Sequence, residues 1–500
     1  MIVNVNEYCT PQNASIGVKQ AIAKADKGDV ISFEKNEYHF YKEYSEHKVY
    51  HMTNTDSFKK PEKYFAVLLE DKEDITIDGN GSVFVIHGDM CALSLIRCRN
   101  IVLKNFTIRY NAPTNFEMTV QEKRKNSIIY SLPDGNHFDV RGRNIYFFER
   151  SPFSNEKYYE LKNKPHSYCN VLHNGDDVHR TQVSPVRAVT KIKRISDTEV
   201  CISYLIPPSL KVGDTITMSE NYCRATSGLF FWECSDIISE NITVNYMHGF
   251  GWLSQMCENL TFEKISFKPA DGYVVSSFAD CIHVCGCKGY VRINDCFFTH
   301  PHDDGINIHG AFLRLKKIVN EKTAVFEFVH KQQGGYKSFF KGDRVKLYDR
   351  RNLKELNGIY TVSDSVDNIN EKTVKITFEE KLPDMTPKMF VCENITYNPE
   401  VTISNCTFRA IPTRGILCTT DKPSEIFSNK FISLKMPDIY ISCDCRDWYE
   451  SGPCKNMKIY NNIFSQKDPV VLDPLCMLKP VDNVHENIKI YDNKTEVIDE

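Results

Sequence analysis

The chain lacks long apolar runs, an excess of charge of either sign and cysteine pairs spaced for zinc. No stretch of its 500 residues approaches the roughly 18 apolar residues of a membrane-spanning helix, so no membrane partner is expected. The formal net charge is -3, from 62 basic and 65 acidic residues, and no basic run carries interleaved aromatics. Nucleic acid is therefore not an expected partner either. A homodimer stays open.

The first residues, Met1 to Glu7, lack the basic and apolar segments of a signal peptide. We expect a cytoplasmic protein, or a secreted one if a leader has been removed. The chain contains 19 cysteines but is far too large to need disulfide staples. Free thiols are expected, because several cysteines lie in strand-like segments where a buried thiol serves as a small apolar filler: Cys98, Cys234, Cys257, Cys285, Cys287 and Cys406.

A short motif recurs along the chain and predicts an all-β solenoid. Its copies begin at Cys98, Cys234, Cys257, Cys287 and Cys454. In each copy an Asn, Asp or Gly stands two residues after the cysteine, and a second Asn, or Lys in one copy, stands five residues later. Both positions suit residues that tolerate left-handed backbone and bond their equivalents in the next turn. Alternating apolar residues between them indicate stacked parallel strands, one coil above another.

Two long stretches interrupt the repeat and carry strand patterns of their own. Lys211-Val-Gly-Asp-Thr-Ile in the first and Phe340-Lys-Gly-Asp-Arg-Val in the second resemble copies of one turn between antiparallel strands. We therefore expect two inserted β domains. The resulting division is an N-terminal cap and loop at 1–64, first coils at 65–112, an insertion at 113–225, further coils at 226–310, a second insertion at 311–393, and C-terminal coils at 394–500.

The segment from His302 to Gly310 is central to the functional prediction. It places two adjacent carboxylates, Asp303 and Asp304, before a short strand with Ile306 and Ile308. Successive side chains of a strand point to opposite faces. The two isoleucines should therefore point inward, whereas Asn307 and His309 should point to solvent or to a ligand.

Asp280 stands 24 residues before Asp304, a spacing that suits one coil. Aligning the two aspartates places Ile282 on Ile306, His283 on Asn307 and Val284 on Ile308. Strands of neighbouring coils lie about 4.8 Å apart, so Asp280 and Asp304 should stack with Asp303 beside them. Three carboxylates are thus expected on one patch.

Three carboxylates on one patch suit general acid and base catalysis. Like charges this close cannot all ionise freely, so at least one pKa should be raised. Glycoside hydrolysis needs one protonated carboxyl for the leaving oxygen and one carboxylate for water or for the sugar carbon. Asp-Asp-Gly is also a common turn sequence, but its coincidence with Asp280 and with the outward Asn307 and His309 favours catalysis.

Histidines near these acids invite a metal-binding interpretation, because imidazoles and carboxylates together can hold zinc or manganese. They are His283, His300, His302 and His309. Outward histidines in a carbohydrate cleft serve equally well as hydrogen-bond donors to hydroxyls. We therefore expect no metal and no cofactor.

Four further residues are candidates for substrate binding. Arg414 opens a coil, and its alternative role is that of a solvated turn arginine. Trp448 and Glu450 lie in a loop rich in aromatic and charged residues, and they could merely close that loop around Gly452-Pro453. Trp252 follows two glycines and is more often a packing residue, but it lies one coil before Asp280.

Several of these motifs together resemble the α-1,3-galactosidases of glycoside hydrolase family 110. The resemblance covers nearly the whole chain and rests on Ala279 to His283, Gly286 to Gly289, His302 to Gly310, Thr413 to Leu417 and Trp448 to Pro453. It implies a right-handed parallel β-helix with two inserted small β-barrel domains. It also implies an inverting exo-enzyme that removes terminal α-1,3-linked galactose from oligosaccharides or glycoconjugates, with Asp303 as acid and Asp280 and Asp304 together as base.

Two other functions stay open on the residues alone. A polygalacturonase-like β-helix hydrolase also places paired aspartates on neighbouring coils, but such enzymes bind uronates through an Arg-x-Lys motif, and the matching place here reads Arg414-Gly-Ile. A non-catalytic carbohydrate-binding solenoid would need outward aromatics but no acid triad. The expected partner in the preferred interpretation is an α-galactoside oligosaccharide.

Overall fold

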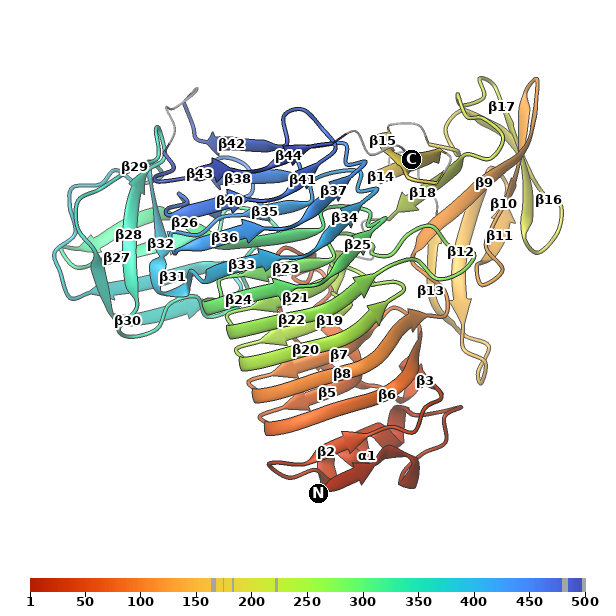
Figure 1. Ribbon diagram of the computed structural model, residues 1–500, viewed down its shortest axis with the longest axis horizontal. Coiled ribbons are helices and arrows are strands. Elements are labelled where there is room, and N and C mark those ends of the chain that lie inside the picture. Colours follow the sequence, from red (N-terminus) through yellow and green to blue (C-terminus); the bar gives the residue numbers. More distant parts are fainter. Residues whose placement is uncertain (163–167, 174, 182–183, 221–223, 479–483, 497–500) are drawn as a thin grey trace.

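The protein is a right-handed parallel β-helix that carries two β insertions (Figure 1). The computed structural model describes residues 1–162, 168–173, 175–181, 184–220, 224–478 and 484–496. Coils stack from the N-terminus at the bottom of Figure 1 to the C-terminal strands at the top, and the insertions project to opposite sides. Within these ranges, no helix has the length and apolar character needed to cross a membrane.

Two long parallel sheets form the walls of the helix. One contains β1 (Ile2–Asn4), β2 (Val30–Ser32), β3 (Glu37–Tyr41), β6 (Glu73–His87), β8 (Arg99–Tyr110), β20 (Ser235–Val244), β22 (Glu258–Phe267), β24 (Lys288–Asn294), β25 (Phe297–Thr299), β33 (Glu400–Ser404), β34 (Thr407–Arg409), β36 (Ser424–Phe427), β37 (Lys430–Ile432), β40 (Met457–Tyr460), β41 (Ile463–Phe464), β43 (Lys489–Tyr491) and β44 (Lys494–Thr495). We call it the ladder sheet.

The second wall carries the candidate site, and we call it the site sheet. Its parallel strands are β5 (Glu62–Glu70), β7 (Cys91–Ile96), β19 (Leu229–Trp232), β21 (Trp252–Gln255), β23 (Ile282–Cys285), β26 (Ile306–Asn320), β35 (Ile416–Cys418), β38 (Ile439–Asp444) and β42 (Val470–Leu475). Two short strands pair antiparallel with it, β4 (Glu46–Val49) with β5 and β39 (Glu450–Ser451) with β26.

The helix α1 (Ser15–Lys24) lies at the N-terminal end, where it covers the first coil. Val18, Ala21 and Ile22 form its buried face. Strands β2 and β3 already pair in parallel with β6, so the first coil includes residues that the sequence assigned to the cap. These strands lack the cysteine-asparagine motif, which is why the repeat was visible only from later coils.

The recurring motif has the predicted backbone. Asn100, Asn105, Asp236 and Asn241 all have φ between 51° and 60°, in the left-handed region. The Asn241 side-chain amide donates to Asn105 Oδ1 at 2.8 Å, across one coil step. These asparagines therefore turn each coil at the same place and bond the coil below.

Inward side chains fill the helix with a continuous core. Phe298, Phe408, Phe431 and Phe464 stack in sequence with ring centroids 4.8 to 5.1 Å apart. Each such pair contributes about 0.5–1.5 kcal/mol beyond the area it buries. The cysteines in the described ranges are free thiols and most are buried, as expected, whereas Cys223 lies outside those ranges.

The first insertion consists of antiparallel strands between β8 and β19. Over its described residues, the strands form one seven-stranded and one three-stranded sheet. The larger contains β9 (Asn115–Arg124), β10 (Ser127–Ser131), β14 (Tyr168–His173), β15 (Asp177–Thr181), β16 (Val189–Arg194), β17 (Glu199–Tyr204) and β18 (Thr215–Ser219), and the smaller contains β11 (His137–Arg141), β12 (Asn144–Arg150) and β13 (Lys157–Lys162).

The second insertion is a closed barrel. Strand β26 begins in the site sheet and continues into the barrel, where it pairs with β27 and β32. The ring runs through β26, β27 (Thr323–Glu327), β31 (Thr373–Phe378), β30 (Tyr360–Asn368), β28 (Arg344–Asp349) and β32 (Phe390–Asn394), and β29 (Lys354–Glu355) pairs with β28. The strand that directly follows Asp303 and Asp304 is thereby anchored in two cores.

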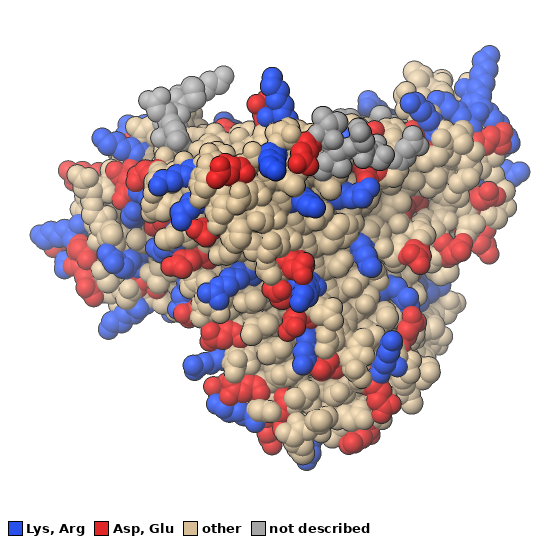
Figure 2. Space-filling view, in the orientation of Figure 1, with Lys and Arg blue, Asp and Glu red and all other residues tan. Residues whose placement is uncertain are grey.

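Figure 2 shows acidic and basic side chains interspersed over the face that carries the ladder sheet. This distribution agrees with the small net charge of -3. No single-sign field dominates this face, so any charge recognition must be local.

Candidate active site

The strand register at the site is the one that the sequence predicted. Ile282 pairs with Ile306 and His283 with Asn307 between β23 and β26. Ile306 and Ile308 are fully buried, as the alternation requires. The outward side chains of these two strands therefore form one continuous row, and Asp280 and Asp304 precede it at the same edge of the site sheet.

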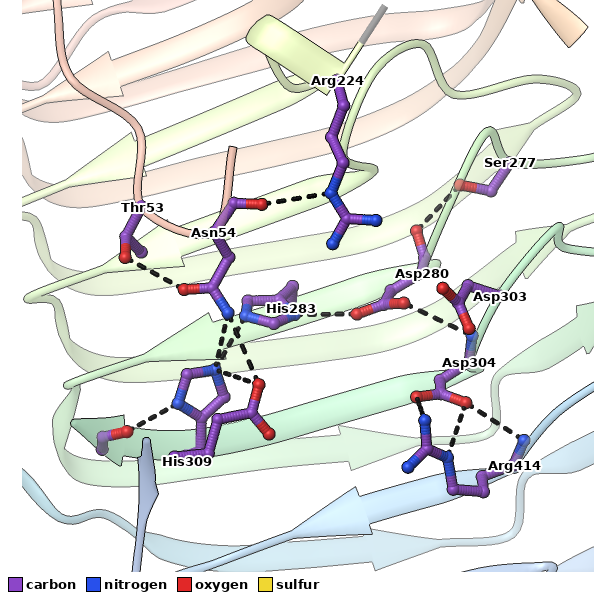
Figure 3. Close-up of polar contacts among 12 residues, drawn as sticks. Thr53, Asn54, Arg224, Ser277, Asp280, His283, Asp303, Asp304, His309 and Arg414 are labelled. Carbon is purple, nitrogen blue, oxygen red and sulfur yellow. Dashed lines mark hydrogen bonds and ion pairs between the residues drawn. The ribbon is translucent and has the colours of Figure 1, made fainter. Parts of the chain in front are cut away.

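The three aspartates converge at that edge (Figure 3). One oxygen of each carboxylate lies within 4.8 Å of the others, and the Asp304 backbone N–H donates to Asp280 Oδ1 at 3.3 Å. The Asp303 side chain is 26 % exposed, whereas those of Asp280 and Asp304 are 6 % and 4 % exposed. Asp303 is thus the member of the cluster that reaches furthest into the open space.

Three arginines from separate parts of the chain surround the cluster. Arg414 holds Asp304 through its backbone N–H at 3.1 Å, its Nε at 3.0 Å and a terminal nitrogen at 3.0 Å. Arg180, from β15 of the first insertion, places a terminal nitrogen 3.5 Å from Asp303 Oδ1. Arg224 packs its guanidinium between the rings of Phe250 and Trp448, 4.6 and 5.5 Å from their centroids.

The same three carboxylates form the one group, within the described ranges, whose geometry would admit a metal ion. Their oxygens already accept hydrogen bonds from Arg414, from His283 and from the Asp304 backbone. Three guanidinium groups also supply positive charge in the place where an ion would supply it. The donor set is therefore that of a charge-compensated acid cluster rather than of an ion cage.

The three carboxyl groups of the cluster differ in pKa: two have raised values and one has a lowered value. Burial, together with the charge of Asp303, raises the pKa of Asp280 and Asp304 to about 7. For Asp303, burial acts to raise the pKa, but the surrounding guanidinium groups outweigh it, and the pKa lies below its ordinary value. The prediction of at least one raised pKa is confirmed. Near neutral pH the cluster therefore shares protons as a unit.

A chain of two histidines extends from Asp280. Asp280 Oδ2 lies 2.8 Å from His283 Nδ1, and His283 Nε2 lies 2.9 Å from His309 Nε2. His309 Nδ1 lies 2.6 Å from the carbonyl of Gly310, which can only accept, so this nitrogen carries a proton.

This geometry couples the protonation of Asp280 to that of His309. If Asp280 is ionised, His283 donates to it from Nδ1, and His283 Nε2 must accept from His309, which is then an imidazolium. Burial opposes a charge on His309, but the carboxylate of Glu450 and other neighbours outweigh it and raise its pKa to about 10. Burial and His309 hold the pKa of His283 well below its ordinary value.

A cavity of about 270 Å³ opens above these groups. This volume lies just below the roughly 300–1,000 Å³ of drug-sized sites and suits about one sugar ring. Seven of the nine predicted site residues line it: Asp280, Asp303, Asp304, Asn307, Arg414, Trp448 and Glu450.

The prediction for Trp252 is wrong. Trp252 pairs with Ile282 in the parallel register, so its side chain points inward, and it is fully buried between Phe231 and Phe262. The outward position of that strand belongs to Leu253, which aligns with His283. Proximity by one coil was a poor guide because it ignored the period-two alternation.

The prediction for His309 also needs correction. Its outward direction is as expected, but its side chain is fully buried and lies behind the cavity rather than on its wall. Strand β39 pairs with β26 at Gly310 and Ala311 and covers this part of the sheet. His309 thus contacts His283 and the carboxylate of Glu450, 3.5 Å away.

Several wall residues were missed from the sequence. Asn54 comes from the aperiodic stretch assigned to a loop, and its side-chain amide lies 3.5 Å from Glu450 Oε1. Arg180 and Arg224 come from the stretch 113–225 that was assigned to the first insertion. His283 and His302 also line the wall, and the sequence had placed both near the acids without assigning them to the substrate site. The wall residues that the sequence did not single out are Asn54, Arg180, Ser219, Arg224, Phe250, Phe278, Ala279 and Leu417.

Comparison with known proteins gives a family match within the second insertion and relatives that align with most of this chain. The family described as GLAA-B beta-barrel domain II matches residues 323–388, within the second insertion. An alpha-1,3-galactosidase A of Peterkaempfera griseoplana is 31 % identical over 96 % of this chain and 70 % of its own length. An alpha-1,3-galactosidase A of Akkermansia muciniphila is 30 % identical over 88 % of this chain and 73 % of its own length.

Among solved structures, the Family 28 exopolygalacturonase of Yersinia enterocolitica aligns with 100 % of this chain and 66 % of its own, at 11 % identity and a TM-score of 0.40. A polygalacturonase from Erwinia carotovora aligns with a TM-score of 0.34 at 9 % identity, over 98 % of this chain and 93 % of its own. Similarity at this level says nothing about function, and the β-helix follows from the strand pairing itself.

Proposed function

Because the chain belongs to glycoside hydrolase family 110, the α-1,3-galactosidases, we propose that it releases terminal α-1,3-linked galactose with inversion. Membership of this family makes the protein a glycoside hydrolase that removes α-linked galactose. The observation that carries the proposal is the cluster of three carboxylates at the floor of a cavity of about 270 Å³. The cavity accommodates the terminal sugar alone, as an exo-acting enzyme requires.

In this proposal Asp303 is the general acid. Its side chain is the most exposed of the three carboxylates, so it is the one that can reach a glycosidic oxygen. Asp280 and Asp304 lie deeper and stacked, where they hold one water on the opposite side of the anomeric carbon. Inversion requires acid and base to be separated by roughly 6.5–9.5 Å, which leaves room for that water. In the free site the nearest oxygens of the three carboxylates lie within 4.8 Å of one another, so Asp303 has to move away from the stacked pair when substrate binds.

Substrate binding has to move the shared proton. In the free site the proton lies on the stacked pair, because Asp303 has the lowest pKa of the three. A glycosidic oxygen can accept a hydrogen bond only from neutral Asp303, so a bound substrate favours the proton there. The transfer leaves Asp280 and Asp304 ionised, which is the state that accepts a proton from water.

Two features of the wall support a neutral sugar as ligand. Asn307 Oδ1 is buried, lines the cavity and has no hydrogen-bond partner among the described groups, so a sugar hydroxyl can satisfy it. Glu450, Trp448 and Arg414 lie on the same wall. Arg414, which stands where polygalacturonases carry their uronate-binding Arg-x-Lys motif, is already engaged by Asp304.

The experiment that tests the proposal is a screen of matched glycosides with the purified chain. An α-1,3-linked galactosyl disaccharide should release galactose, whereas its β-linked counterpart and an α-galacturonide of the same leaving group should not react. Hydrolysis of the galacturonide in preference to the galactoside would favour a polygalacturonase-like enzyme. Binding without hydrolysis of any of the three would favour a non-catalytic solenoid.

A further inference from the structure

A second cavity of about 420 Å³ lies beside the first, toward the N-terminal coils. It is found at the edge of the site sheet where β5, β7, β19 and β21 begin, and the aspartates lie at the same edge near β23 and β26. The charged and titratable residues of its wall are Lys42, Lys59, Lys60, Lys63, Glu62, Asp89 and His248.

Lys63 is the unusual member of this wall. It is 2 % exposed, and its ammonium donates to the backbone carbonyl of Lys60. Among the described carboxylates, none forms an ion pair with Lys63, whereas Lys42 pairs with Asp89 at 2.5 Å and Lys59 with Asp56 at 3.5 Å. A buried ammonium without a countercharge is costly unless a ligand supplies one.

The two carboxylates of the wall do not pair with Lys63 in the described structure: Asp89 pairs with Lys42, and no ion pair joins Glu62 to Lys63. His248 is buried, and burial lowers its pKa to about 4, so it is neutral at physiological pH. Burial also lowers the pKa of Lys63, to about 8, and the nearby charge of Lys60 adds to this effect. Lys63 therefore remains mostly charged at neutral pH, and an anion in the cavity would favour the charged form further.

The same two segments of the chain border both cavities. Arg224 lines the first, and the next two residues, Ala225 and Thr226, line the second. The segment from Asn54 to Tyr64 likewise passes from the first to the second, and it is fixed to this wall because the Asp56 N–H donates to the Arg224 carbonyl at 2.9 Å. A molecule whose terminal sugar occupies the first cavity can therefore extend toward the second.

We propose that the second cavity binds an anionic group, a sulfate ester or a carboxylate, carried by the substrate beyond the galactose that is removed. The proposal rests on the proposed function and names the class of galactoside that the enzyme favours. Lys63 is the principal contact, and the wall stays net positive because it holds four lysines against two carboxylates, Glu62 and Asp89. The cavity takes no part in bond cleavage and acts through binding alone.

The test compares two α-1,3-galactosides that differ only in a sulfate ester on the second sugar. We expect the sulfated one to have a kcat/KM about tenfold higher, mainly through a lower KM, because one charge-assisted contact is worth about that factor. In Lys63→Met, which keeps the alkyl stem, the advantage should fall below threefold while the neutral substrate is cleaved as before. Lys430→Met, at an exposed position of β37 in the ladder sheet, is a control for the loss of one positive charge.

A second readout keeps the test informative if Lys63→Met folds poorly. Lys59 is exposed, so Lys59→Met should fold and should lower the same advantage by a smaller factor. Inorganic sulfate, compared with sodium chloride at equal ionic strength, should raise the melting temperature of the wild-type protein and inhibit cleavage of the sulfated substrate more than of the neutral one.

The outcomes separate the two proposals. Equal kcat/KM for both substrates with no sulfate effect would overturn the anion site while leaving the galactosidase proposal intact. A sulfate effect without a preference for the sulfated substrate would mean a site for free anions and would also overturn it. No cleavage of either galactoside would refute the proposed function, and a sulfate-induced stabilisation lost in Lys63→Met would still identify the cavity.

Discussion

On both walls of the β-helix, equivalent side chains of neighbouring coils stack on one another, but the stacked residues are asparagines on one wall and aspartates on the other. On the ladder sheet, Asn105 and Asn241 lie one above the other, and one amide donates to the next. At the edge of the site sheet, Asp280 and Asp304 occupy equivalent places, and burial together with the charge of Asp303 raises their pKa values to about 7. An amide has both a donor and an acceptor, so stacking stabilises it, whereas a carboxylate can stack favourably only when it is protonated or offset by a cation.

The contrast explains why the chemistry lies on one wall only. The ladder sheet needs no partner from elsewhere in the chain, because each coil satisfies the coil below. The site sheet needs Arg414 from a later coil and Arg180 from an insertion to hold its like charges together. Stored repulsion of this kind is typical of sites that must donate and accept protons near neutral pH.

The largest expected effect is a loss of kcat when any one of the three clustered carboxylates is replaced. Asp280→Asn, Asp303→Asn and Asp304→Asn should each lower kcat by about 10²–10⁴, the range of a general acid or base. With a leaving group that needs no protonation, Asp303→Asn should recover more activity than the other two. Steady-state kinetics on a disaccharide and on a dinitrophenyl galactoside measure this. Equal recovery in all three variants would contradict the role of Asp303.

A smaller effect is expected from the histidine chain behind Asp280. His309→Gln removes the imidazolium that favours ionised Asp280, so the acidic limb of the kcat/KM profile should move to higher pH, with a loss of about 10-fold at pH 6. His39→Gln, on β3 in the first coil, is the control. An unchanged limb together with a lowered rate at every pH would mean that His309 acts only through packing.

The ladder sheet should respond in stability and not in rate. Asn241→Ala loses the hydrogen bond to Asn105 and places an unfavourable residue at a φ of 51°, so unfolding free energy should fall by about 1–2 kcal/mol. Asn241→Gly keeps the backbone preference and should recover part of the loss. Denaturant unfolding measures both variants. A change in kcat for either would argue against the separation of the two walls.

The smallest effect concerns a single buried acid outside the cluster. Glu117, in β9, accepts from the N–H groups of Val274 and Val275, and burial raises its pKa to about 8. Because this folded pKa exceeds the unfolded value, near 4.5, its contribution is fully present below pH about 4.5 and is lost as pH rises through about 8. Melting temperatures between pH 5 and 8 should fall less steeply in Glu117→Gln. An identical slope would contradict the raised pKa.

The features that recur with each coil, namely the strand register and the turn residues, could be predicted from the sequence. The alignment of Asp280 with Asp304 rested on a 24-residue spacing, and the observed pairing of Ile282 with Ile306 has that register. The left-handed asparagines were predictable for the same reason, since each coil imposes the same turn on the same residue type.

The rest of the site depends on contacts that no periodicity encodes. Asn54 lies in an aperiodic segment, and Arg180 lies in an insertion far from the coils in sequence. His309 was placed on the correct face, but the burial of that face by β39 could not be foreseen from a strand pattern. Trp252 could have been excluded from the sequence, because aligning the motif copies at Cys257 and Cys287 places Trp252 on Ile282, which points inward.

The central claim is that Asp303 and the stacked pair act from opposite sides of the sugar, and the anomeric configuration of the first product tests it most directly. Proton NMR during the first minutes of hydrolysis of an α-1,3-linked galactoside should show β-galactose, with the α anomer appearing later at the rate of mutarotation. The appearance of α-galactose first would mean a covalent intermediate on one of the aspartates and would contradict the account.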